Sequence, residues 1–211
     1  AERSWKELDT NRIQKTLLYT NSQNQLEIRL GMIEYRDFPV LEWTVYVKNN
    51  GPQDSPMIDN LLGLNLRVDC EPGGDFVLHH NGGSFTGMSA YAPFSTPIEK
   101  GIYRTFGAYH GRPSDTDMPY FNLELAQNTG FIFAIGWPGQ WKTELMRAGD
   151  NTLMLRAGQQ LTHFVLRPGE EVRSPLTVLL FWDQTDWIEA QNIWRRWMFA
   201  HNFPQPGGKP L

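Results

Sequence analysis

Apolar and polar residues alternate along much of this chain, in short segments separated by turn sequences. In residues 26–32 and 41–48 every second side chain is apolar, and those between are mostly polar or charged. This period of two is that of a β-strand with one buried face. Turn residues recur at 49–54, 71–75, 81–83, 128–130, 147–151 and 167–171. The pattern predicts a mainly β fold, an antiparallel sandwich with short connections.

One segment near the end of the chain has a helical period instead. Five of its apolar residues fall on one stripe: Trp187, Ala190, Trp194, Trp197 and Met198. Asp186 and Glu189 have the spacing of a capping box, which predicts that a helix begins at about Trp187. It should end near 201–202, because Pro204 cannot continue a helix.

Charge and cysteine content exclude several classes of protein. The 211 residues carry a formal net charge of -4 and no basic run, which gives no electrostatic basis for binding nucleic acid. Cys70 is the single cysteine, so neither an intrachain disulfide nor a four-thiolate zinc site can form. Apolar runs such as 176–182 are far shorter than the roughly 20 residues of a membrane helix. We therefore expect no nucleic acid, membrane, metal or cofactor as partner.

Residues capable of catalysis do not form a convincing cluster. His79 and His80 are adjacent in an expected strand, so their side chains should point to opposite faces and cannot share one metal ion. Three pairs of carboxylates are close in sequence, but each lies in a turn or before the helix, where turn and cap chemistry explains it. These pairs are Asp115/Asp117, Glu170/Glu171 and Asp183/Asp186. The chain is predicted to hold no catalytic residue.

The heptapeptide IGWPGQW, at 135–141, places two tryptophans beside a Pro-Gly turn. An indole face can pack against the C–H groups of a sugar, and charged side chains nearby can bond its hydroxyl groups. The predicted substrate-binding set is accordingly Trp137, Trp141, Arg112 and Asp115. Because tryptophan is by default a core residue, at least one of the two indoles is also expected to be buried at the end of the sandwich.

Five motifs follow one another in an order that a known family shares. They are GRPS at 111–114, AIGWPGQW at 134–141, PGE at 168–170, RSP at 173–175 and QNIWRRW at 191–197. With these motifs, the chain resembles the N-terminal β-supersandwich domain, of the galactose-mutarotase-like type, of glycoside hydrolase family 36 α-galactosidases. The resemblance extends from about residue 59 to residue 204.

The resemblance implies a division of the chain and a location for the reaction. Residues 1–184 would form the supersandwich, 185–203 a linking helix packed on it, and 204–211 a linker toward a catalytic (β/α)8 barrel. In the family, the barrel carries both catalytic aspartates of a retaining mechanism. This chain alone would then be inactive and would support the barrel, its implied partner. Contact with α-galactoside sugars and assembly with further copies of the chain are implied as well.

Two other functions stay open from the residues alone. One is an autonomous carbohydrate-binding module with Trp137 and Trp141 as its aromatic wall. The other is a complete enzyme similar to a mutarotase, in which His110 and Asp115 would converge on one sugar ring. The family resemblance favours neither of them. It also implies that part of the terminal helix presents apolar surface for contact with the barrel.

Overall fold

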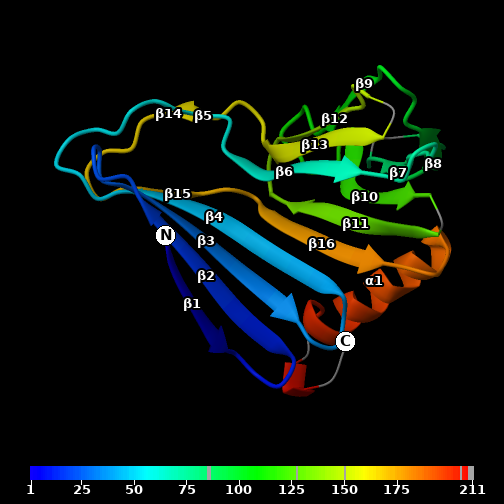
Figure 1. The fold of residues 1–211 in the computed structure, drawn as a ribbon, viewed down its shortest axis with the longest axis horizontal. Helices are drawn as coiled ribbons and strands as arrows, with labels where there is room; N and C mark the ends of the chain where they lie inside the picture. Colours follow the sequence, from blue (N-terminus) through cyan, green and yellow to red (C-terminus); the bar gives the residue numbers. More distant parts are fainter. Residues whose placement is uncertain (85–86, 127, 150, 205, 209–211) are drawn as a thin grey trace.

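The computed structural model describes residues 1–84, 87–126, 128–149, 151–204 and 206–208. These residues form antiparallel sheets and a single α-helix near the end of the chain, which confirms the predicted mainly β fold (Figure 1). A short 3-10 helix, η1 (Pro206–Gly208), follows the α-helix.

The largest sheet contains ten strands, each antiparallel to its neighbours. They are β1 Glu2–Glu7, β2 Arg12–Thr20, β3 Leu26–Tyr35, β4 Val40–Asn49, β7 Val77–Gly82, β8 Pro93–Pro97, β10 Asp117–Leu125, β11 Thr129–Gly136, β15 Glu171–Arg173 and β16 Leu176–Trp182. Nine of them follow the order β1-β2-β3-β4-β16-β11-β10-β7-β8. The tenth, β15, pairs with the end of β4 that β16 leaves free.

A smaller sheet covers part of the large one. Its four strands are β6 Leu62–Asp69, β9 Tyr103–Gly107, β12 Trp141–Met146 and β13 Thr152–Gln159, in the order β6-β13-β12-β9. A separate ladder joins β5 (Ile58–Asp59) to β14 (His163–Phe164). The four-stranded sheet stacks on the β7, β10 and β11 side of the large sheet, and together they form the sandwich (Figure 1).

Aromatic side chains fill the space between these two sheets. Phe121 and Phe133 stack with ring centroids 4.8 Å apart, and Trp141 meets Phe121 edge-on at 5.8 Å. Leucines from the four-stranded sheet, including Leu64 and Leu155, close the cluster from the other side and are almost fully buried. Burial of such side chains is the main stabilising term of the sandwich.

The single α-helix of the described chain, α1 (Trp187–His201), packs on the opposite face of the large sheet. It begins at the predicted residue, and the Asp186 carboxylate caps it by accepting a 2.7 Å hydrogen bond from the Glu189 backbone N–H. Ala190 and Trp197 are its buried residues, packed in a cluster with Ile132 of β11. No helix in the described ranges is long and apolar enough to cross a membrane.

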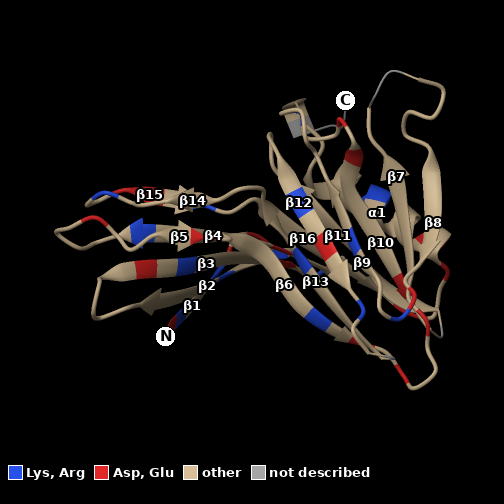
Figure 2. Ribbon diagram, turned by 90° about the horizontal axis from the view of Figure 1, so that it is seen from above, with Lys and Arg blue, Asp and Glu red and all other residues tan. Residues whose placement is uncertain are grey.

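Strands β1 to β3 form a wing that extends beyond the sandwich (Figure 2). The four-stranded sheet does not reach over it, so its side chains are partly or fully exposed except for the buried Tyr35 at the end of β3, and those of β1 are all exposed. The alternation predicted at 26–32 is present in β3, but its apolar face is shallowly buried, and Ile28 is 44% exposed. Alternation gives the face of a strand; whether another layer covers it depends on tertiary structure.

Replacing Trp197 by alanine should detach the helix from the sheet. Trp197 is 1% exposed, and loss of a buried tryptophan costs about 3–5 kcal/mol of unfolding free energy. Urea denaturation of Trp197→Ala measures this, with Ile188→Ala, on the same helix and 54% exposed, as the control. The control should lose less than about 1 kcal/mol. Equal losses in the two variants would contradict the packing described.

Candidate functional site

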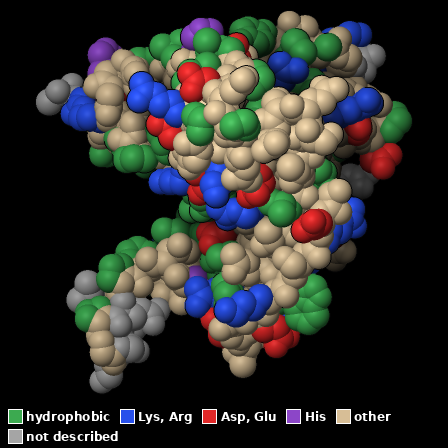
Figure 3. Space-filling model, turned by 90° about the vertical axis from the view of Figure 1, so that its left-hand side faces the viewer, with side chains coloured by type: hydrophobic (Ala, Val, Ile, Leu, Met, Phe, Trp, Pro, Cys, Tyr) green, Lys and Arg blue, Asp and Glu red, His purple; other side chains and the backbone are tan. Residues whose placement is uncertain are grey.

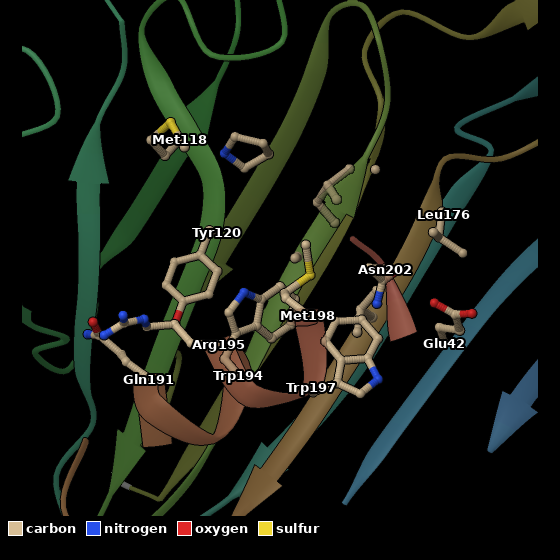
Figure 4. Close-up of a pocket in the computed structure, with 15 residues that line it drawn as sticks. Glu42, Met118, Tyr120, Leu176, Gln191, Trp194, Arg195, Trp197, Met198 and Asn202 are labelled. Carbon is tan, nitrogen blue, oxygen red and sulfur yellow. The ribbon is translucent and has the colours of Figure 1, made fainter. Parts of the chain in front are cut away.

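A groove of about 530 Å³ runs between α1 and the face of the large sheet on which the helix lies. Its walls are mainly apolar, with Trp194 and Met198 from the helix and Tyr120, Leu176 and Val178 from the sheet. Figure 4 shows the labelled side chains lining this space. We call it the helix groove. It is large and apolar enough to receive side chains from another surface.

The groove exists because the apolar stripe of α1 is wider than its contact with the sheet. Ala190 and Trp197 bury the centre of the stripe. Trp194 lies beside them, edge-on to Tyr120 at 5.1 Å, and stays partly exposed. Phe199 is 47% exposed and lies outside the buried stripe. The terminal helix thus presents apolar surface, as predicted.

Polar side chains mark the two ends of the helix groove (Figure 4). Arg195 and Gln191 lie at one end and Glu42 at the other. The Tyr35 hydroxyl donates a 3.0 Å hydrogen bond to Glu42 Oε1. Burial raises the pKa of Glu42, while this hydrogen bond and the positive charge of Arg12 act in the opposite direction. The groove therefore contains a carboxyl group that resists ionisation more than a surface glutamate does.

Trp141 does not form part of an exposed aromatic wall, and this prediction is wrong. The side chain is fully buried in the sandwich core, and its indole N–H donates a 2.6 Å hydrogen bond to the Pro113 carbonyl. An indole without exposed surface cannot stack on a sugar. The expectation that one of the two tryptophans closes the end of the sandwich is confirmed, and the hydrogen bond also ties the loop of GRPS to the core.

Asp115 organises the same loop from within. Its carboxylate accepts hydrogen bonds from the backbone N–H of Tyr109 at 3.1 Å and of His110 at 2.6 Å, and from the Thr116 hydroxyl at 3.1 Å. Burial tends to raise the pKa of Asp115, but these bonds outweigh it, and the pKa lies below its usual range. Only 1% of the side chain is exposed. His110 Nδ1 is 3.3 Å from it, yet this carboxylate cannot reach a sugar.

Trp137 and Arg112 are the two predicted site residues with accessible surface. Trp137 is half-buried, and the Arg173 guanidinium lies 5.4 Å from the centre of its ring. Arg112 is exposed, in the loop held by Asp115. No contact joins Trp137 to Arg112 among the described interactions, so the four predicted residues do not form a single site. Sugar contact by either residue stays a prediction.

The adjacent histidines point to opposite faces, as predicted. His80 faces the sandwich core, where it packs on Phe106 and where burial lowers its pKa to about 4. His79 faces α1 and stacks on Trp187 with ring centroids 4.1 Å apart. Its ring nitrogens lie 2.8 Å from Ser95 Oγ and 2.8 Å from Glu124 Oε2. No sequence motif connects residues so far apart, and only the strand register brings them together.

Several carboxylates of the three predicted pairs have structural roles, although Asp117 lies in strand β10 rather than in the predicted turn. Asp117 accepts the backbone N–H of Gly107 at 2.9 Å, Glu170 that of Arg167 at 2.8 Å, and Asp186 caps α1. Glu171 pairs with Arg29 on the wing. Among the described residues, no group of three or more histidine, cysteine and acidic side chains could hold a metal ion.

No family model matches this chain, and no curated protein does. Among solved structures, the α-galactosidase from Lactobacillus brevis matches 94% of this chain with a TM-score of 0.76 and 13% identity, over 26% of its own length. The GH36 α-galactosidase AgaA from Geobacillus stearothermophilus matches 83% with a TM-score of 0.69 and 16% identity, over 24% of its length.

These matches establish the fold that the motifs suggested. The galactosidase domain of the α-galactosidase–sucrose kinase AgaSK has it too, with a TM-score of 0.72, 17% identity and 87% of this chain covered. This chain spans about a quarter of each of these proteins. A TPR-domain protein from Parabacteroides distasonis matches 85% of the chain at a TM-score of 0.54. The fold alone therefore does not specify an activity.

Replacing Trp141 by phenylalanine tests its role as a structural plug. The variant keeps an apolar ring but leaves the Pro113 carbonyl without its donor, and it opens a small cavity. We expect a loss of about 2–4 kcal/mol in the free energy of unfolding, measured by urea denaturation. Trp137→Phe is the matched control, with an expected loss below about 1 kcal/mol. A larger loss in the control would refute the assignment.

Glu42 should make stability depend on pH in a defined direction. Its pKa is raised by folding, so the stability it contributes is complete below the unfolded value of 4.5 and is lost as the pH rises through the folded pKa. Glu42→Gln removes this titration. We therefore expect the variant to gain stability relative to wild type as the pH rises from 4.5 to neutral. Urea midpoints across this range measure the difference, and a difference independent of pH would exclude the role of Glu42.

Proposed function

We propose that this chain is the non-catalytic N-terminal domain of a retaining α-galactosidase-type glycoside hydrolase, whose reaction takes place in a following (β/α)8 barrel. The observation that carries the proposal is the fold match with α-galactosidases over 83–94% of this chain. The chain corresponds to only about a quarter of those proteins, which leaves room for a separate catalytic domain. The five ordered motifs support the same family.

The carboxylates of this chain support a non-catalytic role. A retaining glycosidase needs two carboxyl groups about 5–5.5 Å apart that face the same sugar. Asp115, Asp117 and Glu170 instead accept hydrogen bonds from nearby backbone N–H groups, and Asp186 caps a helix. These carboxylates are engaged in hydrogen bonds within the chain. In this proposal, the nucleophile and the acid/base therefore belong to the barrel.

The helix groove is where the barrel would dock in this proposal. Residues 1–184 then form the supersandwich, 185–203 the linking helix and 204–211 the linker. Trp194 and Met198 line an apolar groove on that helix, and Phe199 extends the apolar surface outside it. Covering apolar surface stabilises an interface by about 25 cal/mol per Å² removed from water. A domain that follows the helix in the chain would reach this groove without a long connection.

The second role in this proposal is to support the rim of the active site. Trp141 and Asp115 hold the GRPS loop from inside, and that loop carries Arg112 at its surface. Arg112 and Trp137 are therefore the residues proposed to contact an α-galactoside. Arg112 lies on this anchored loop, and Trp137 packs against the buried core cluster, so both rest on a stable support.

Turnover of an aryl α-galactoside tests where the reaction takes place. The chain of 211 residues should release no more aryl alcohol than a heat-denatured sample of itself. The same chain continued through its encoded downstream residues should hydrolyse the substrate. Turnover by the 211-residue chain alone, abolished in its Asp117→Asn variant, would place the reaction in this domain.

Calorimetric titration separates the proposal from a carbohydrate-binding module. With galactose, melibiose or raffinose at millimolar concentration, the isolated chain should show no heat of binding, because the proposed sugar contacts form only with the barrel. Heat that is lost in Trp137→Ala would favour an autonomous binding module instead.

A further inference from the structure

Strand β1 is an open edge of the ten-stranded sheet. It pairs with β2 on one side, and the sheet ends there (Figure 1). All six of its residues are exposed, and Trp5 is 70% exposed. Seen from the side of the wing, the surface carries Lys/Arg and Asp/Glu side chains intermixed (Figure 3). An exposed edge of this kind is a template for pairing with another strand.

The hydrogen-bond alternation identifies the backbone groups that the edge presents. In the hairpin, the Leu8 backbone N–H bonds the Arg12 carbonyl at 2.9 Å, and the register continues to Glu2 opposite Leu18. In an antiparallel pair, every second residue bonds its partner, and those between point away from it. The even-numbered residues of β1 therefore bond β2. The N–H and C=O groups of Arg3, Trp5 and Glu7 point outward, free to accept a further strand.

The opposite edge of the same sheet is protected. There the Ile98 N–H bonds the Phe76 carbonyl, and the Gly82 N–H bonds the Ala92 carbonyl. By the same alternation, the backbone groups of residues 93, 95 and 97 of β8 point away from β7. Two of these three are Pro93 and Pro97, which have no N–H to donate. Strand β1 has no proline and no irregularity in its register. Of the two terminal strands, β1 and β8, only β8 carries this protection.

We propose that β1 pairs antiparallel with β1 of a second copy of this chain, about a two-fold axis at Ser4. In this register Glu2 of each copy lies opposite Lys6 of the other, and Arg3 lies opposite Trp5. The two charge pairs fall at positions without backbone hydrogen bonds, where opposing side chains are closest. The Arg3–Trp5 pairs bring a guanidinium to an indole face. Both large sheets then become one continuous sheet.

The charges along β1 select this register over the others that the outward groups allow. A two-fold axis at Arg3 or at Lys6 would place like charges directly opposite, which is destabilising. An axis at Trp5 would need Glu7, which already forms a 2.6 Å ion pair with Arg36. Within the described chain, Glu2, Arg3 and Lys6 take part in no ion pair. The Ser4 register uses these uncommitted charges and leaves the existing pair intact.

Charge reversal tests the register directly. Sedimentation velocity of the whole chain over a range of concentrations should show a reversible monomer–dimer equilibrium. Glu2→Lys and Lys6→Glu should each weaken it about tenfold or more, because each places two like-charge pairs in the dimer. The double variant should recover the dimer. Mixing the two single variants should also recover it, since each then supplies the charge that the other lacks.

A further variant tests the strand pairing without changing any charge, and its measurement does not depend on glycosidase activity. Trp5→Pro removes an outward N–H, in the way that Pro93 and Pro97 lack one in β8. The variant should stay folded by circular dichroism and should sediment as a monomer. A chain that is monomeric at every concentration would overturn the proposal. So would a dimer that both single reversals leave unchanged, or one that the double variant and the mixture fail to restore.

Discussion

The burial of three central strands on both faces is the constraint on which this structure depends. Strands β10, β11 and β16 carry the four-stranded sheet on one side and α1 on the other. In β11, Phe133 belongs to the sandwich core and its neighbour Ile132 to the cluster under the helix, and both are fully buried. This is why β11 and β16 read as continuous apolar runs, whereas β3 and β4 alternate. The small sheet, the large sheet and α1 overlap only at these three strands. The helix groove and the buried Trp141 therefore both lie beside them.

The sequence predicted local features well and burial across layers poorly. Alternation located β3 and β4, and the spacing of Asp186 and Glu189 located the start of α1, because each depends on residues within a few positions. Trp141 and Trp137 look equivalent in sequence. Trp141 is buried because it faces the sandwich core from β12, against Phe121, and its indole bonds the Pro113 carbonyl 28 residues away in the chain. Such distant partners have no local signature.

The helix groove and the contacts of His79 differ in how far the sequence could predict them. The groove had a signal, since the apolar stripe of α1 is broader than one sheet contact needs. The contacts of His79 with Ser95 and Glu124 had none, because they depend on the register of β7 between β8 and β10. The motif order pointed to the fold correctly, but not to which site residues reach the surface. Two of these motifs contain buried or loop-anchoring groups, the Trp141 indole and the Pro113 carbonyl that it bonds.

The unequal edges of the large sheet bear on the size of any assembly built through it. A sheet with two unprotected ends could recruit copies at both and grow into a fibre. Here Pro93 and Pro97 terminate one end, and a two-fold contact at the other end would use up its free hydrogen-bonding groups. Growth through the two terminal strands would therefore stop at a closed pair. Two prolines on a short edge strand would separate a finite particle from an open-ended polymer.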